Sequence, residues 1–77
     1  MEDSDFLKKV LLLALFNRDE NVSIQDVIAE LDATQAITMV ESKQLLKEIK
    51  EANLLVDGKF TALGEEKVGE AQKFFEI

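Results

Sequence analysis

The chain contains no cysteine and no histidine. Without cysteine it can form no disulfide, no thiolate metal site and no thiol nucleophile. Without histidine it lacks the usual zinc ligand and the commonest general base. A Gly-rich phosphate loop is also absent, and we expect Glu65, Glu66 and Glu70 to form a solvated helix face. We therefore expect no enzyme, no cofactor and no bound metal ion.

Long apolar runs are missing as well. The strongest one, Val10–Phe16, covers seven residues, whereas a helix that spans a bilayer needs roughly 20. The chain begins Met1-Glu2-Asp3-Ser4-Asp5 and lacks the basic start of a secretory signal. Because 47% of the residues are apolar, we expect a folded chain. These features predict a soluble cytoplasmic protein without membrane contact.

The charge is large, negative and unevenly distributed. The length of 77 residues predicts one domain, residues 1–77. Its net charge of −7 repels nucleic acid phosphates at long range. Residues 38–62 are neutral, however, so all the excess acid lies outside them. Their four acidic and four basic residues are Glu41, Glu48, Glu51, Asp57, Lys43, Lys47, Lys50 and Lys59.

The first predicted helix begins near Asp3 or Ser4 and continues to Phe16. Its apolar residues go nearly all the way round the helical wheel, which is typical of a helix buried between two surfaces. It is either the central core helix or a helix that also packs on a second protomer. The expected dimer or partner interface consists of Phe6, Val10, Leu13 and Phe16, together with Phe74 and Phe75 near the end of the chain.

The second helix has the clearest start. Ser23 and Asp26 form a variant of the capping box, and Val22 and Val27 are spaced as a hydrophobic staple across it. One face is expected to be buried, because Ile24, Val27, Ile28 and Leu31 follow the i, i+3, i+4, i+7 spacing. Residues 32–37 connect this helix to the next, and they include neither glycine nor proline.

A third helix over residues 38–52 is predicted from the cap Thr38 with Glu41 behind it. Its buried face is Leu45, Leu46, Ile49 and Ala52, with Met39 and Ser42 at the margin. Lys43, Lys47 and Lys50 recur at i, i+4, i+7 on the opposite side and form one stripe. This lysine stripe is either a cationic contact surface or ordinary charge pairing with the neighbouring glutamates.

A hairpin and a last helix complete the pattern. Asp57-Gly58 between two apolar runs predicts a tight turn between strands 54–56 and 59–61. Asn53 is suited to the left-handed stop of the preceding helix, and Thr61 can cap the following one. The apolar side of the last helix comprises Leu63, Val68, Ala71, Phe74 and Phe75.

From Val22 to about Glu70 the sequence resembles the winged helix-turn-helix family. The most specific part is KQLLKEIKEANLLVDGKFTALGEE, Lys43–Glu66. Family members commonly show Leu-x-x-Leu-x-x-Ala-Gly-Leu-Ile, a wing, and then Leu-Thr-x-x-Gly into a closing helix. Here Asn53 replaces the usual glycine, and the connection before the third helix is longer than in the family. The resemblance implies a mainly α winged-helix fold in the order helix, helix, helix, hairpin, helix.

The resemblance also implies a function. In family members that bind double-stranded DNA, the third helix enters the major groove and reads base edges. The corresponding positions here are Thr38, Ser42, Lys43, Gln44 and Lys47. Lys50 of the same helix and Lys59 of the wing (54–61) would contact phosphates. The chain is thus expected to be a small DNA-binding transcription regulator. The alternative is an acidic winged-helix module for protein interaction or dimerisation that binds no DNA.

Overall fold

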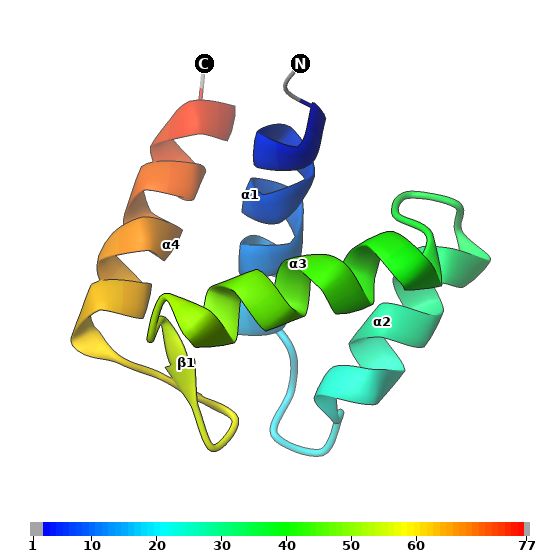
Figure 1. The fold of residues 1–77 in the computed structure, drawn as a ribbon, viewed down its shortest axis with the longest axis horizontal. Coiled ribbons are helices and arrows are strands. Elements are labelled where there is room, and N and C mark those ends of the chain that lie inside the picture. Colours follow the sequence, from blue (N-terminus) through cyan, green and yellow to red (C-terminus); the bar gives the residue numbers. More distant parts are fainter. Residues whose placement is uncertain (1–2, 77) are drawn as a thin grey trace.

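The computed structural model describes residues 3–76, which form four helices and one small antiparallel hairpin (Figure 1). The elements are α1 (Asp3–Phe16), α2 (Ile24–Ala33), α3 (Met39–Glu51), β1 (Leu55–Val56), β2 (Lys59–Phe60) and α4 (Ala62–Phe75). The prediction of a mainly helical protein with this order of elements is confirmed. Each strand is one residue shorter than expected.

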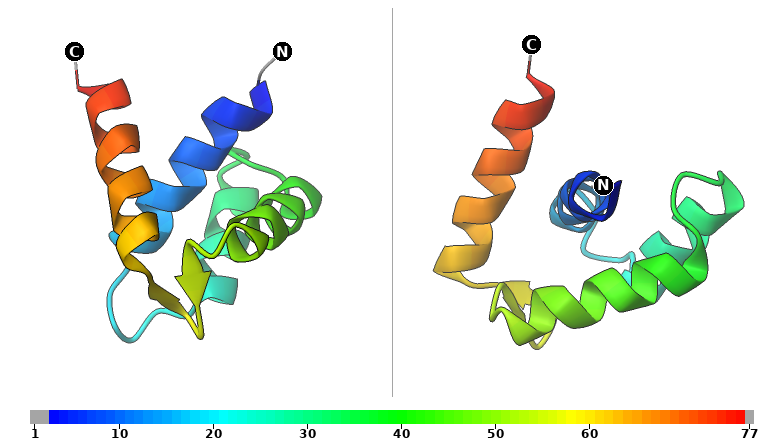
Figure 2. Two further views of the ribbon diagram at one scale, coloured as in Figure 1. Left: turned by 60° about the vertical axis from the view of Figure 1, so that its left-hand side comes forward. Right: turned by 45° about the horizontal axis from the view of Figure 1, so that its top comes forward.

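Helix α1 lies at the centre of the molecule. Viewed nearly along its axis in Figure 2, it is surrounded on three sides by α4, α3 and α2. Leu11, Leu12 and Leu15 are buried, and Val10 and Leu13 are partly buried against the core. The segment is therefore a core helix, as predicted, and the packing of its remaining side on a second protomer stays a prediction. The expected caps Asp3 and Ser4 lie within the helix, and their side chains are outside the described part of the structure.

Helix α2 begins as predicted. The Asp26 amide donates to Ser23 Oγ at 3.1 Å, and the Ser23 amide donates to Asp26 Oδ2 at 3.3 Å. The helix continues to Ala33 and ends in a Schellman motif, in which the Ala36 amide bonds to the Leu31 carbonyl. Gln35 adopts a φ of 63° in this motif. The connection is therefore residues 34–38, and it carries the fully buried Ile37.

Helix α3 is fixed at both ends by polar contacts. Thr38 Oγ1 accepts a hydrogen bond from the Glu41 amide at 3.2 Å, and Asp32 Oδ1 accepts one from the Met39 amide at 3.1 Å. At the other end Asn53 has a φ of 62°, and the Leu54 amide bonds to the Ile49 carbonyl. The predicted left-handed stop at Asn53 is confirmed. It sends the chain straight into the hairpin.

The hairpin pairs Leu55 with Phe60 and Val56 with Lys59. Its two-residue turn has positive φ at both Asp57 (53°) and Gly58 (79°), as a type I′ turn requires. The first turn of α4 is then closed by Thr61, whose Oγ1 accepts from the Gly64 amide at 3.0 Å. The predictions of the turn and of this cap are both confirmed.

Candidate nucleic-acid interface

The lysine stripe lies on the outer side of α3, which crosses in front of α1 in Figure 1. Lys43, Lys47 and Lys50 are exposed, and so is Gln44 beside them. The buried side of the same helix carries Leu45, Leu46 and Ile49. The helix therefore separates an apolar side, packed on α1 and α2, from a polar side that is open to a ligand.

Among residues 5–76, whose side chains the structure describes, no ion pair involves a cation of the lysine stripe. The ion pairs described there join Lys8 to Glu48 (3.2 Å), Lys9 to Asp5 (2.6 Å) and Lys67 to Glu70 (3.5 Å). Glu48, one of the expected partners of the stripe, is thus turned toward α1. None of these ion pairs is the charge pairing within α3 that the alternative interpretation of the stripe requires.

One of the predicted base-reading residues, Ser42, must be corrected. Ser42 is 0% exposed, so it cannot contact a base edge. Its position follows from helical spacing, because Ser42, Leu45, Leu46 and Ile49 stand at i, i+3, i+4, i+7 on the core side. Thr38 is exposed, but its hydroxyl already accepts from the Glu41 amide and donates to Glu41 Oε1. Thr38 acts as the helix cap and is still exposed, so Thr38, Lys43, Gln44 and Lys47 remain the predicted reading candidates.

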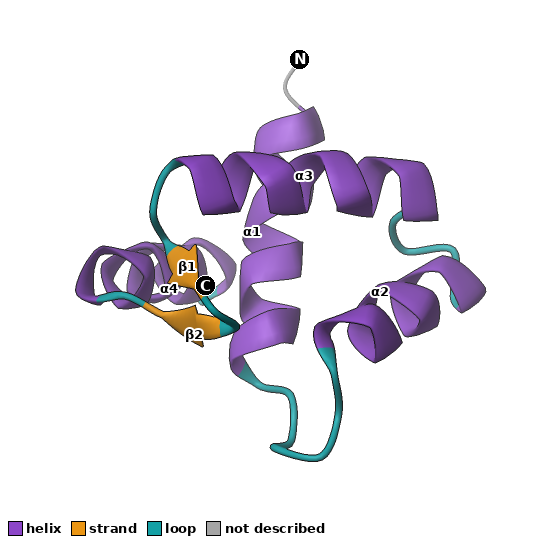
Figure 3. Ribbon diagram, turned by 60° about the horizontal axis from the view of Figure 1, so that its bottom comes forward, coloured by secondary structure: helices purple, strands orange, loops and turns teal. Residues whose placement is uncertain are grey.

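The hairpin carries the remaining predicted contact, Lys59, which is exposed on β2. The hairpin follows directly after the carboxyl end of α3 (Figure 3). Phe60, next to Lys59, packs edge-to-face on Phe16 with ring centroids 5.6 Å apart. Phe16 therefore packs on its own chain and is still 44% exposed, so its place at a partner interface stays a prediction.

Sequence reasoning missed one residue here, Arg18. Its Nη1 donates to the Val22 carbonyl at 2.7 Å, and its Nη2 donates to the Gly58 carbonyl at 3.0 Å. Arg18 thus joins the α1–α2 connection to the hairpin turn, 40 residues further along the chain. No local pattern identifies such a contact, because it depends on how two distant loops meet.

The other aromatic residues expected at the interface lie near the beginning of α1 and the end of α4. Phe6 packs on Phe74 and Phe75 with ring centroids 6.1 and 5.5 Å apart, and Lys9 Nζ lies 5.0 Å from the centroid of Phe74. The three rings remain 40–50% exposed. This aromatic cluster, defined by Phe6, Phe74 and Phe75, stabilises the α1–α4 contact and also leaves an apolar surface.

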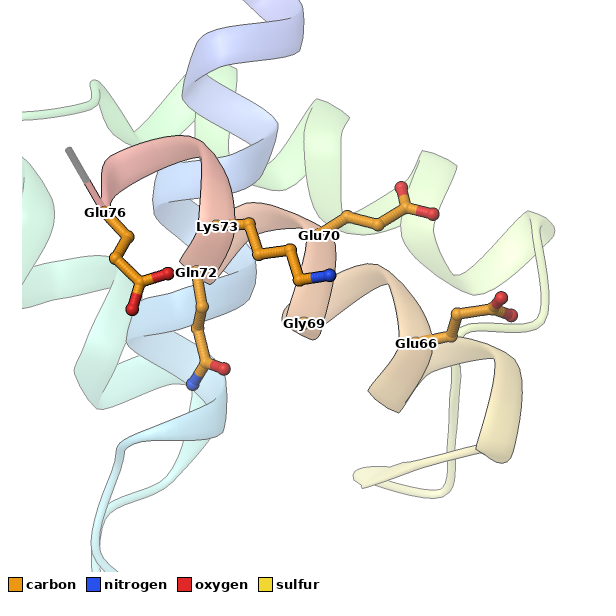
Figure 4. Close-up of a pocket in the computed structure, with 6 residues that line it drawn as sticks. All are labelled: Glu66, Gly69, Glu70, Gln72, Lys73 and Glu76. Atoms are coloured by element: carbon orange, nitrogen blue, oxygen red, sulfur yellow. The ribbon is translucent and has the colours of Figure 1, made fainter.

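A hollow lies along α4 and the residue that follows it. Figure 4 shows that its lining residues, Gly69 among them, come from α4 and from Glu76 just after the helix. The side chains are Glu66, Glu70, Gln72, Lys73 and Glu76. Glu65, Glu66 and Glu70 are exposed, which confirms the predicted solvated face. Where side chains are described, over residues 5–76, there is no group of three or more acidic side chains that could hold a metal ion.

Comparison with known proteins identifies no relative of this chain. No protein-family model, no curated protein and no solved structure matches it. Among the helices of residues 3–76, none has both the length and the apolar character needed to cross a membrane.

Proposed function

We propose that this protein is a small winged-helix DNA-binding protein with a role in transcription regulation. In this proposal α3 is the recognition helix and the hairpin is the wing. The observation that carries it is the lysine stripe, Lys43, Lys47 and Lys50, exposed on one side of α3 and free of acidic partners in the described residues. An unpaired row of cations is what a phosphate backbone attracts, even on a protein whose net charge is negative.

Each exposed residue has a distinct role in this proposal. Gln44 can make a paired contact to adenine, and Lys43 or Lys47 can contact guanine. Lys50 and Lys59 contact phosphates, which fixes the register of the helix without reading sequence. Val40 is 79% exposed at the start of α3, where an apolar side chain suits a thymine methyl group.

The test is a pair of double substitutions that change the net charge equally. Lys43→Glu with Lys47→Glu should abolish retention of double-stranded DNA at low salt, while circular dichroism stays that of the wild type. Lys67→Glu with Lys73→Glu, on exposed positions of α4, should retain most of the binding. If the wild type retains no fragment of a random-sequence duplex library at low salt, the proposal is wrong.

The second candidate is a protein-interaction module of the same fold. It is favoured by the net charge of −7 and by the large exposure of Val40 within a polar helix face. A protein partner would bind through Val40. Its binding should therefore be weakened more by substitution of Val40 than by substitution of the lysines. Val40→Asp should then abolish partner capture, whereas the Lys43→Glu, Lys47→Glu double variant should preserve it. The DNA proposal predicts the larger effect from the lysines.

We also propose that the protein forms a homodimer. The support is the exposed aromatic cluster and the fourth side of α1, which α2, α3 and α4 leave open in Figure 2. Phe16 also belongs to the proposed interface, since it packs on Phe60 and is still 44% exposed. Val10 and Leu13 remain in it, since they are only partly buried. Light scattering that gives the monomer mass at high micromolar concentration would contradict this proposal.

A further inference from the structure

Arg18 occupies an unusual position for the only arginine of the chain. It lies in the connection between α1 and α2 and is partly buried. Both hydrogen bonds described for its guanidinium go to main-chain carbonyls, those of Val22 and Gly58, at 2.7 and 3.0 Å. None of the ion pairs among the described side chains, those of residues 5–76, involves it. Its charged guanidinium therefore binds the main chain of two separate segments.

The hairpin needs such support. Each strand has only two residues, and an isolated two-stranded hairpin is barely stable in water. Gly58 stands at the tip of the turn, where its carbonyl has no partner within the strand pairing of residues 55–60. Phe16 packs on Phe60 near the base of the hairpin. Arg18 is the contact described at the tip itself.

We infer that Arg18 is the positioning residue that holds the hairpin turn in place, and through it Lys59. The functional part of this inference rests on the proposed function. If the wing binds DNA, Arg18 fixes the geometry in which the wing presents Lys59 to a phosphate. The planar guanidinium is required, because two different nitrogens reach two carbonyls from separate loops. A lysine ammonium keeps the charge but offers a single nitrogen.

The first measurement concerns the hairpin alone. Amide hydrogen exchange of residues 55–60 should accelerate about tenfold in both Arg18→Lys and Arg18→Gln, since charge-assisted hydrogen bonds are lost. Exchange of the α1 core amides should change less. Ser23→Ala removes the α2 cap and serves as a control for general destabilisation, with no selective effect on the hairpin. Hairpin exchange that is unchanged in the Arg18 variants would overturn the inference.

The second measurement is a double-mutant cycle on affinity for a DNA duplex. If Arg18 acts through Lys59, then Arg18→Lys should weaken binding as much as Lys59→Gln does, and the combined variant should be no weaker than either. Additive losses would overturn the positioning role, because they would mean an independent contact by Arg18. If the wild type binds no duplex, the proposed function fails, and the exchange data alone then decide whether Arg18 holds the turn.

Discussion

The Cα of Gly64 packs directly on the main-chain carbonyl of Leu54. A Cβ at position 64 would overlap the carbonyl oxygen and would lie 2.9 Å from its carbon and 3.0 Å from Cδ1 of Phe60. This contact brings the first turn of α4 against the segment that leaves α3. Thr61 reinforces it, because its hydroxyl donates to the Asn53 carbonyl at 2.7 Å and its amide bonds to the Leu54 carbonyl.

Gly64→Ala should therefore destabilise the protein strongly. The added methyl group meets backbone that cannot rotate away, so the loss should reach about 3 kcal/mol, the upper end of the usual cost of overpacking. Urea denaturation followed by circular dichroism measures it. The matched control is Gly69→Ala in the same helix, where a Cβ meets nothing within 4 Å. That variant should gain about 0.5–1 kcal/mol. Equal effects at the two sites would contradict this account.

Ser42→Ala should be neutral or stabilising. The Ser42 hydroxyl is fully buried and has no hydrogen-bond partner within the described residues, and such a group costs about 1–3 kcal/mol. We expect a gain of about 1 kcal/mol in thermal or urea unfolding. In contrast, Thr38→Ala removes a helix cap and should cost about 1 kcal/mol. A Ser42→Ala variant that folds well but binds DNA poorly would show that the hydroxyl has a function we have not assigned.

Local chemistry explains why much of the fold could be predicted from the sequence. The Ser23 cap, the Asn53 stop and the Asp57-Gly58 turn each depend on residues within a few positions of one another. The burial of Ser42 also agrees with the helical spacing of the sequence, because Ser42 lies on the same side of α3 as Leu45 and Ile49. Ser42 was predicted at the margin of the buried face, and its base-reading role came only from the resemblance to winged-helix proteins; the structure buries it fully.

Contacts between distant segments could not be predicted in the same way. Arg18 and Gly58 are 40 residues apart, and Phe16 meets Phe60 only because the hairpin folds back beside the end of α1. Ile37 lies in a connection but is buried under the helices. In each case the partner is chosen by the packing of whole elements. A single sequence indicates only that the side chain is apolar or charged.

The ion pair between Lys9 and Asp5 provides a test by pH. The hydrogen bond from Lys9 Nζ (2.6 Å), together with its charge, holds the pKa of Asp5 below its ordinary value of 3.8. Because the folded-state pKa is the lower one, the stabilisation is present above the ordinary value and is lost as pH falls through the folded-state pKa. Carboxyl NMR titration should show this lowered pKa, and Lys9→Met should return it toward 3.8. An unchanged pKa in that variant would contradict the assignment to Lys9.

The salt dependence of binding measures how many lysines contact phosphate. The proposed contact surface holds four of them, Lys43, Lys47, Lys50 and Lys59, all exposed. If one protomer uses them all on phosphates, the logarithm of the binding constant should fall with the logarithm of salt concentration at a slope of about −3 to −4. Lys50→Gln and Lys59→Gln should each make the slope less negative by about 0.9. Lys73→Gln, on α4, should leave it unchanged.

Fluorescence anisotropy with a labelled duplex over a salt series gives these slopes. A wild-type slope near zero would mean that binding does not involve the phosphate backbone, and the lysine stripe would then lose its proposed role.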